Sequence, residues 1–225
     1  FGIKDGSPKN WDAWITPDET WVYVSASSFK ITGVNVTAKY PAGTRLKFTQ
    51  TTVKYAVVTS STFSTDTTVN IAVNTDYTIA NAAITANYYS YAVNPQGYPG
   101  FFNYTPTLSN ISGGTLNHAK FNLTGSTVDV RFKYTLAGAG VGATPTMTLP
   151  VNANADYATA GESFQSLFSY IDAGVNFYAG YALWSSSSTA AFRYQTGTTI
   201  NSLSSTAPFT WGASDFIQGH LSYQI

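Results

Sequence analysis

The chain contains two histidines, and their positions decide whether a histidine-based active site is expected. His118 follows the pair Gly113-Gly114 in a loop-like stretch, and His220 falls on the predicted outer face of the last strand. They lack the His-x-x-x-His or His-x-His spacing of a metal site, and no Gly-x-Ser-x-Gly elbow accompanies them. Cysteine is absent, which excludes disulfides and cysteine-ligated metal or iron–sulfur sites. We therefore expect surface or interface histidines, with no catalytic triad and no metal ligands.

Eleven acidic residues could supply the carboxylate pair of a glycoside hydrolase. Asp129 lies in a legible strand, two residues from Arg131 and on the same outward face, so we expect an exposed ion pair. Aspartate is favoured beside turn formers, where it bonds the local backbone, and several others occupy such places: Asp66, Asp76, Asp156, Asp172 and Asp215. The sequence therefore predicts no catalytic residues, no cofactor and no enzymatic activity.

Aromatic side chains are the other candidates for binding. Tyr178, Trp184 and Tyr194 would stack on sugar rings if they were exposed beside polar neighbours, or they belong to the core or to a subunit interface. Trp11 and Trp14 lie in a proline-bounded arm and need a surface to cover. That surface is either the first domain of this chain or a neighbouring subunit.

Composition narrows the class of protein. Charged residues make up 10% of the chain, against about 25% in an ordinary globular domain, and the formal net charge is zero. The 16 Tyr, 14 Phe and 5 Trp argue against disorder. No basic patch is evident along the sequence, so no nucleic-acid partner is expected. No apolar run approaches the roughly 18 residues that span a bilayer, so no membrane insertion is expected.

Hydrophobic alternation predicts strands along most of the chain. In residues 128–134, Val128 and Phe132 share one face while Asp129 and Arg131 share the other, as in a half-buried strand. Residues 175–184 are apolar on both faces, which is typical of a central strand or of one that meets a partner. Residues 217–225 alternate to the end of the sequence, so the C-terminus is expected to lie in a sheet.

The secondary structure of three segments does not follow from hydrophobic alternation. Residues 79–86 are rich in Ala, which favours a short helix, although a strand and turn fit equally well. Residues 138–142, Gly-Ala-Gly-Val-Gly, predict a flexible loop rather than a strand interior. Residues 161–170 fit one helical turn or a crossing segment. Short strands with turn signals every 8–12 residues or so are typical of all-β sandwiches and barrels.

Residues 94–106 divide the chain. Three prolines fall in these thirteen residues, interleaved with Tyr98, Phe101, Phe102 and Tyr104. Proline interrupts helices and central strands, and the aromatics are costly to leave in water, so we expect a packed joint. The predicted organisation is an arm at 1–18, a β-domain at 19–93, the joint at 94–106, and a jelly-roll-like β-sandwich at 107–225.

Several motifs resemble those of tailed-bacteriophage and prophage virion proteins. The motifs are Thr-Gln-Thr-Thr-Val-Lys-Tyr at 49–55, a stretch at 73–91 that contains Asp-Tyr-Thr-Ile-Ala-Asn-Ala, and Asn-Pro-Gln-Gly-Tyr-Pro-Gly at 94–100. The tryptophan arm at 11–14 and Thr-Trp-Val-Tyr at 20–23 add to them. The resemblance covers residues 11–106 well and the rest loosely, where Pro208-Phe-Thr-Trp211 is similar to the closing strands of such domains.

The resemblance implies a non-enzymatic structural component of a virion, of the tail, fibre, neck or capsid-decoration type. Its partners would be other virion proteins and copies of itself, with a homotrimer favoured, and a jelly-roll C-terminal domain would be the exposed part. The alternative is a carbohydrate- or receptor-binding adhesin module, with a host surface glycan as its ligand. A polysaccharide-degrading enzyme is disfavoured because paired acids are scarce.

Overall fold

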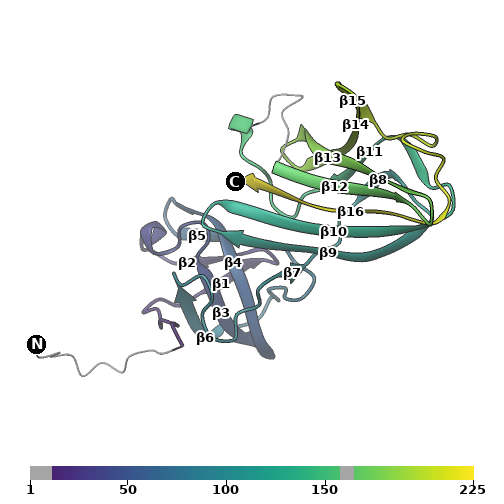
Figure 1. The fold of residues 1–225 in the computed structure, drawn as a ribbon. Helices are drawn as coiled ribbons and strands as arrows, with labels where there is room; N and C mark the ends of the chain where they lie inside the picture. The colour runs from purple at the N-terminus through teal and green to yellow at the C-terminus, as the bar shows by residue number, and fades with distance from the viewer. Residues whose placement is uncertain (1–11, 158–164) are drawn as a thin grey trace, which may run out of the picture. The chain divides into compact units, whose positions relative to one another are not determined.

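The computed structural model describes residues 12–157 and 165–225, and it is built from strands. Within these ranges the helical elements are two short 3-10 turns, η1 (Thr37–Lys39) and η2 (Ala155–Tyr157). The chain divides into two compact units, one of Phe1–Ala72 with Tyr77–Gly100, the other of Val73–Asp76 with Phe101–Ile225. Each unit has its own curled sheet, so the all-β class predicted from alternation is confirmed (Figure 1).

The first unit contains a six-stranded sheet in the order β1-β2-β5-β4-β3-β6. Strand β4 (Thr52–Phe63) curls this sheet, because its first half pairs with β3 (Arg45–Gln50) and its second half with β5 (Thr67–Ile71). A register shift between Val58 and Ser60 marks a bulge, which bends and twists the strand there. The remaining strands are β1 (Val22–Ser25), β2 (Ser28–Ile31) and β6 (Thr85–Ser90).

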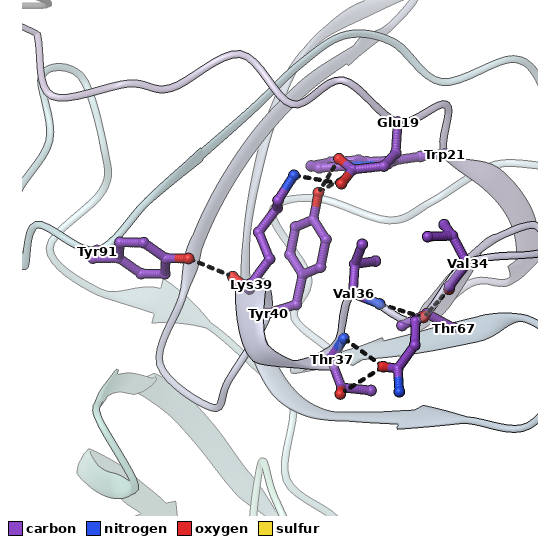
Figure 2. A network of polar contacts seen from close by, with 10 residues as sticks. Glu19, Trp21, Val34, Val36, Thr37, Lys39, Tyr40, Thr67 and Tyr91 are labelled. Atoms are coloured by element: carbon purple, nitrogen blue, oxygen red, sulfur yellow. Dashed lines mark hydrogen bonds and ion pairs between the residues drawn. The ribbon is translucent and has the colours of Figure 1, made fainter.

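A buried aromatic group fills the core of this unit. Trp21 stacks on Phe29 with ring centroids 4.3 Å apart and meets Tyr40 edge-on at 6.0 Å. The Trp21 indole N–H donates to the Tyr40 hydroxyl at 3.2 Å, and that hydroxyl donates to Glu19 at 3.4 Å (Figure 2). Glu19 also forms an ion pair with Lys39. The polar ends of the core aromatics are thus satisfied at the edge of the unit.

The second unit contains a sheet in the order β7-β9-β10-β16-β12-β13-β14-β11-β8, with β15 paired to β14. Its strands are β7 (Phe102–Asn103), β8 (Leu108–Ile111), β9 (Gly114–Thr124), β10 (Thr127–Ala137), β11 (Val141–Thr148), β12 (Gln165–Asp172), β13 (Asn176–Ser186), β14 (Thr189–Thr196), β15 (Thr199–Ser202) and β16 (Ala213–Gln224).

The connection between β7 and β8 shows that this sheet curls on itself. The two strands stand at opposite ends of the strand order, yet only residues 104–107 join them. Such a link spans at most about 18 Å, whereas nine strands laid flat would extend about 38 Å at their usual spacing. The sheet therefore has an inner face, which carries the core, and an outer face. Phe132, Phe168 and Phe192 meet on the inner face, at 5.8 and 5.2 Å between ring centroids.

Alternation predicted the strands of this unit well. Strand β10 buries Val128, Val130 and Phe132 and turns Asp129 and Arg131 outward, as expected. Strand β16 lies between β10 and β12, so the prediction that the closing segment belongs to a sheet is confirmed.

The structure decides three local expectations. Of the two alternatives for residues 79–86, the strand and turn is the one that forms, because backbone groups at 79–84 are bonded to Gln50 and β6 begins at Thr85. Gly142 lies inside β11 rather than in a loop, because that strand is already paired to β8 at Val141. For residues 161–170 we expected one helical turn or a crossing segment; from Gln165 onward the chain is strand β12 and not a helical turn, and residues 161–164 lie outside the described residues.

Candidate functional site

The motifs that carry the resemblance meet inside the first unit, and Gln50 joins two of them. Its side chain is buried, with 5% exposed. Its amide nitrogen donates to the carbonyls of Ala80 and Ala82 at 2.9 and 3.1 Å, and its amide oxygen accepts from the Ala80 N–H at 2.9 Å. One glutamine therefore satisfies three backbone groups of the alanine-rich stretch and fixes its path beside β3.

Lys54 makes the same connection from the next strand. Its ammonium donates to the Thr78 carbonyl and, at 3.2 Å, to the side-chain oxygen of Gln50. Lys54 and Gln50 are separated by the β3–β4 turn, where Gln50 pairs with Thr52. The Thr-Gln-Thr-Thr-Val-Lys motif is thus a hairpin end whose long polar side chains hold the stretch at 78–82.

Trp14 brings the arm and the proline-rich segment into the same cluster. Its side chain is 1% exposed, and its indole N–H donates to the Gln96 carbonyl at 2.8 Å. The Gln96 N–H in turn donates to the Asp12 carbonyl at 3.0 Å. The Trp14 ring lies 6.1 Å from that of Tyr55 and 6.2 Å from that of Tyr98. Of the two alternatives for the arm, Trp14 covers its own unit, while Trp11 lies outside the described residues.

Gly97 and Arg45 complete the packing around Tyr98. Gly97 has φ +78°, and an added Cβ would lie 3.0 Å from the Tyr55 hydroxyl, so the turn favours glycine twice over. The Arg45 guanidinium lies over the Tyr98 ring at 5.2 Å and donates to the Gly43 carbonyl at 2.7 Å. Burial lowers the pKa of Arg45 and raises that of Tyr98. These groups are placed to hold structure rather than to face solvent.

The aromatics of residues 94–106 each pack within their own unit. Tyr98 belongs to the first, as described. In the second, Phe102 and Tyr104 pack on Phe121, with centroids 5.7 and 5.9 Å apart, and Phe101 lies under the Arg131 guanidinium at 4.5 Å.

The sequence-derived candidates for sugar stacking are not among the residues that line the groove described below. Tyr178 stacks on Phe209 at 5.2 Å, and Phe209 packs on Trp211 at 4.3 Å. Trp184 is 6% exposed and Tyr194 is half-buried. Strand register places Tyr194 opposite Gly180, on the inner face that also carries Tyr178 and Trp184.

A groove of about 670 Å³ lies on the outer face of the second unit, over β9, β10, β16 and β12. Its lining includes Arg131 and His118, the apolar side chains of Phe101 and Leu167, and the polar side chains of Gln218 and His220. Long antiparallel pairings bring these residues together from segments about 11, 53 and 89 positions apart in the sequence. Its lining combines cationic, polar and apolar side chains on a solvent-facing surface, and it is the candidate binding site.

Cations stand opposite one another across this face. Strand register places Lys120 opposite Arg131, and Arg131 opposite His220. It also places His118 opposite Lys133. Like charges directly opposite each other destabilise a sheet. Desolvation, with Coulombic repulsion from Lys120, Lys133 and Arg131, lowers the pKa of His118.

The expected ion pair between Asp129 and Arg131 is not formed. The described ion pairs are Lys30 with Asp66 and Lys39 with Glu19, and no described carboxylate lies within ion-pair distance of Arg131. Arg131 packs instead over the Phe101 ring, where the ring face attracts the cation.

Groups of potential catalytic interest also line the groove. Ser169, His220 and Asp129 come from three neighbouring strands. Their side chains make no hydrogen bond to one another in the described structure, whereas a nucleophile and its base should be within bonding reach. Within residues 12–157 and 165–225, no three His, Cys, Asp or Glu side chains gather as metal ligands would.

The sequence did not predict this groove, because charges were compared along the chain and not between strands that pair in the sheet. The alternation of Asp129, Arg131 and Lys133 was visible, and so was that of His118 and Lys120. Pairing the two segments as a hairpin would have placed these cations side by side. The contributions of His220 and Leu167 depend on β16 and β12, whose register no local pattern reveals.

Comparison with models of protein families, with curated proteins and with solved structures finds no match for this chain. Over the residues that the structure describes, no helix is long and apolar enough to cross a membrane. We therefore infer the function from the motif residues of the first unit and from the outer groove of the second.

Proposed function

We propose that the protein is a non-enzymatic structural component of a bacteriophage virion that acts through assembly with copies of itself and with other virion proteins. The observation that carries this proposal is the use of the motif residues. The polar groups of Gln50 and Lys54 are hydrogen-bonded to the backbone at residues 78–82, and the Trp14 indole N–H is hydrogen-bonded to the Gln96 carbonyl. In a motif that serves a reaction, such groups would face a substrate. The motif residues here instead stabilise the fold of the first unit.

Exposed apolar side chains on the second unit support the assembly part of the proposal. Val175, which precedes β13, and Phe177, the second residue of β13, are 68% and 67% exposed. Register places Phe177 opposite Ile171 of β12, so these two side chains form one outer row. We take a second copy of this chain as the occupant, because the chain has no net charge to keep copies apart. Closed symmetry is the rule for homo-oligomers, and the resemblance favours a trimer.

Native mass in solution tests this row. Light scattering across a dilution series is expected to show a stable oligomer for the parent chain. Phe177→Ser should shift the series towards the monomer, because it removes an exposed ring at the seam. Ile200→Ser is the matched control, since Ile200 is 53% exposed on β15 at the edge of the same unit. A monomer at all concentrations for the parent chain would contradict self-assembly through this row.

A second candidate function is that of a carbohydrate- or receptor-binding module. The outer groove favours it, because apolar side chains from Phe101 and Leu167 lie beside the hydrogen-bonding groups of Ser169 and Gln218. Trp184 and Tyr178 do not enter this candidate, since both pack on the inner side of the sheet.

A further inference from the structure

We propose that the outer groove over β9, β10, β16 and β12 binds the carboxylate or phosphate group of a hydroxyl-bearing ligand, with Arg131 as the principal anion contact. This inference does not depend on the virion role, because a structural protein and a protein of another class could each carry such a site. It rests on the placement of charges, on the shape of the groove and on the groups around its rim.

The charges favour an anion. Charged residues make up only 10% of the chain, yet Lys120, Arg131 and Lys133 lie on adjacent strands of one face. Lys120 and Arg131 are exposed and directly opposite each other, a pairing that costs stability. No described carboxylate lies within ion-pair distance of these three cations. A bound anion would reduce the repulsion among these cations. The protein itself supplies no described carboxylate that does so.

The groove has room for more than an ion. At about 670 Å³ it falls within the range of small-molecule sites. Arg131 is positioned by the Phe101 ring beneath it, at 4.5 Å. A planar guanidinium held in this way can offer two N–H donors to one carboxylate or phosphate. Ser169 and Gln218 offer further donors and acceptors, and Leu167 offers an apolar surface.

Asp129 argues for a ligand with hydroxyl groups rather than a bare polyanion. Its carboxylate lines the same groove and is exposed. A carboxylate accepts hydrogen bonds from hydroxyls but repels phosphate and sulfate. An acidic sugar satisfies both halves of the groove, because it presents an anion and several hydroxyls. A nucleic-acid strand would bring successive phosphates past Asp129 and is disfavoured.

The affinity of the groove for an anion should depend on pH through the protonation of His118. The titratable or charged groups around His118 are Lys120 on its own strand, Arg131, Lys133 and Asp129 on β10, and His220 on β16, while β12 contributes none to the lining. The neighbouring cations disfavour protonated His118, and a bound anion favours it. Binding therefore takes up protons, and affinity rises as the pH falls through the pKa of His118.

The test is a calorimetric titration of the full chain with four probes at low ionic strength. These are trigalacturonate, glucose 6-phosphate, inorganic phosphate and the neutral sugar maltotriose. We expect binding of trigalacturonate or glucose 6-phosphate, and the stronger of the two identifies the anion. Arg131→Gln should weaken that binding about tenfold or more, since a charge-assisted bidentate contact is lost. Asp129→Asn should weaken the binding of that sugar relative to the binding of inorganic phosphate, because it replaces the carboxylate that accepts hydrogen bonds from the hydroxyl groups.

Arg193→Gln is the matched control. Arg193 lies on the outer face of the same sheet, but on β14, where its guanidinium donates to Ser202 at 2.6 Å. Its loss should leave the affinity unchanged, whereas general electrostatic attraction would make it equal in effect to Arg131→Gln. With trigalacturonate, whose carboxylates stay ionised in this range, His118→Gln should abolish most of the tightening between pH 7.5 and pH 5.5. Circular dichroism confirms that each variant is folded.

Four results would overturn the proposal. The first is no binding of either anionic sugar, and the second is equal binding of maltotriose. The third is tight binding of an oligothymidylate, run in parallel, without binding of the anionic sugars. Binding of inorganic phosphate alone would also overturn it, because the groove would then be a simple ion site.

Discussion

Removal of the Trp14 side chain should strongly destabilise the first unit. The ring is 1% exposed, contacts Tyr55 and Tyr98, and donates to the Gln96 carbonyl at 2.8 Å. A tryptophan of this kind buries about 150–250 Å². At about 25 cal/mol/Å² this corresponds to about 4–6 kcal/mol as an upper bound. Core substitutions of Trp by Ala cost about 3–5 kcal/mol, so Trp14→Ala should lower the free energy of unfolding by that amount.

Trp14→Phe separates the ring from the hydrogen bond. Phenylalanine retains most of the buried area, but the Gln96 carbonyl loses its donor. The expected cost is about 1–2 kcal/mol. Ile15→Ala is the control on the same segment, because Ile15 is 40% exposed while its backbone remains bonded to Tyr89. It should change the free energy of unfolding by about 0.5 kcal/mol or less.

Calorimetry combined with urea denaturation measures these changes and can separate the transitions of the two units. The account predicts the order Trp14→Ala, then Trp14→Phe, then Ile15→Ala in decreasing cost. If Trp14→Ala cost no more than Ile15→Ala, the arm would not be anchored as described. The motif cluster would then lose its N-terminal member.

Two further substitutions test the cores of the two units. Tyr40→Phe removes the acceptor of the Trp21 indole N–H, which is buried, and should lower the free energy of unfolding by about 1–3 kcal/mol in urea denaturation (Figure 2); no loss would mean that the N–H finds another acceptor. Gly180→Ala would place a methyl group 2.2 Å from the Tyr170 ring, so it should cost about 1–3 kcal/mol of the second unit's stability by calorimetry. Gly138→Ala is its control, because an added Cβ there has nothing within 4 Å, and equal costs would refute the packing argument.

Local patterns in the sequence predict the strands better than they predict their partners. Strand β10 follows directly from the alternation of Val128, Asp129 and Val130, because side chains on a strand alternate between faces. Burial of Trp184 could not be predicted in this way, since a segment apolar on both faces fits a covered strand and an exposed seam equally. The structure shows a different outcome at each end of β13, where Trp184 is buried and Phe177 is exposed.

The two sites differ in what the sequence could reveal. Gln50 belongs to a recognisable motif, but its bonds to Ala80 and Ala82 cross about 30 residues and override the helical preference of the alanine-rich stretch. The groove depends on the register of β16 against β10 and β12, which brings His220 beside Arg131. Register is set by turns and by the buried face of each strand, and neither specifies which distant strand becomes the neighbour.

Peptide mass spectrometry of purified phage particles tests whether this chain is a structural component of a virion. Particles released by induction of cells that encode this chain would be banded on a density gradient and compared with the soluble fraction. The account predicts peptides of this chain in the particle band, at a stoichiometry that is constant among preparations and a multiple of the oligomer found by light scattering. Peptides confined to the soluble fraction, with intact particles lacking the chain, would contradict the proposed structural role.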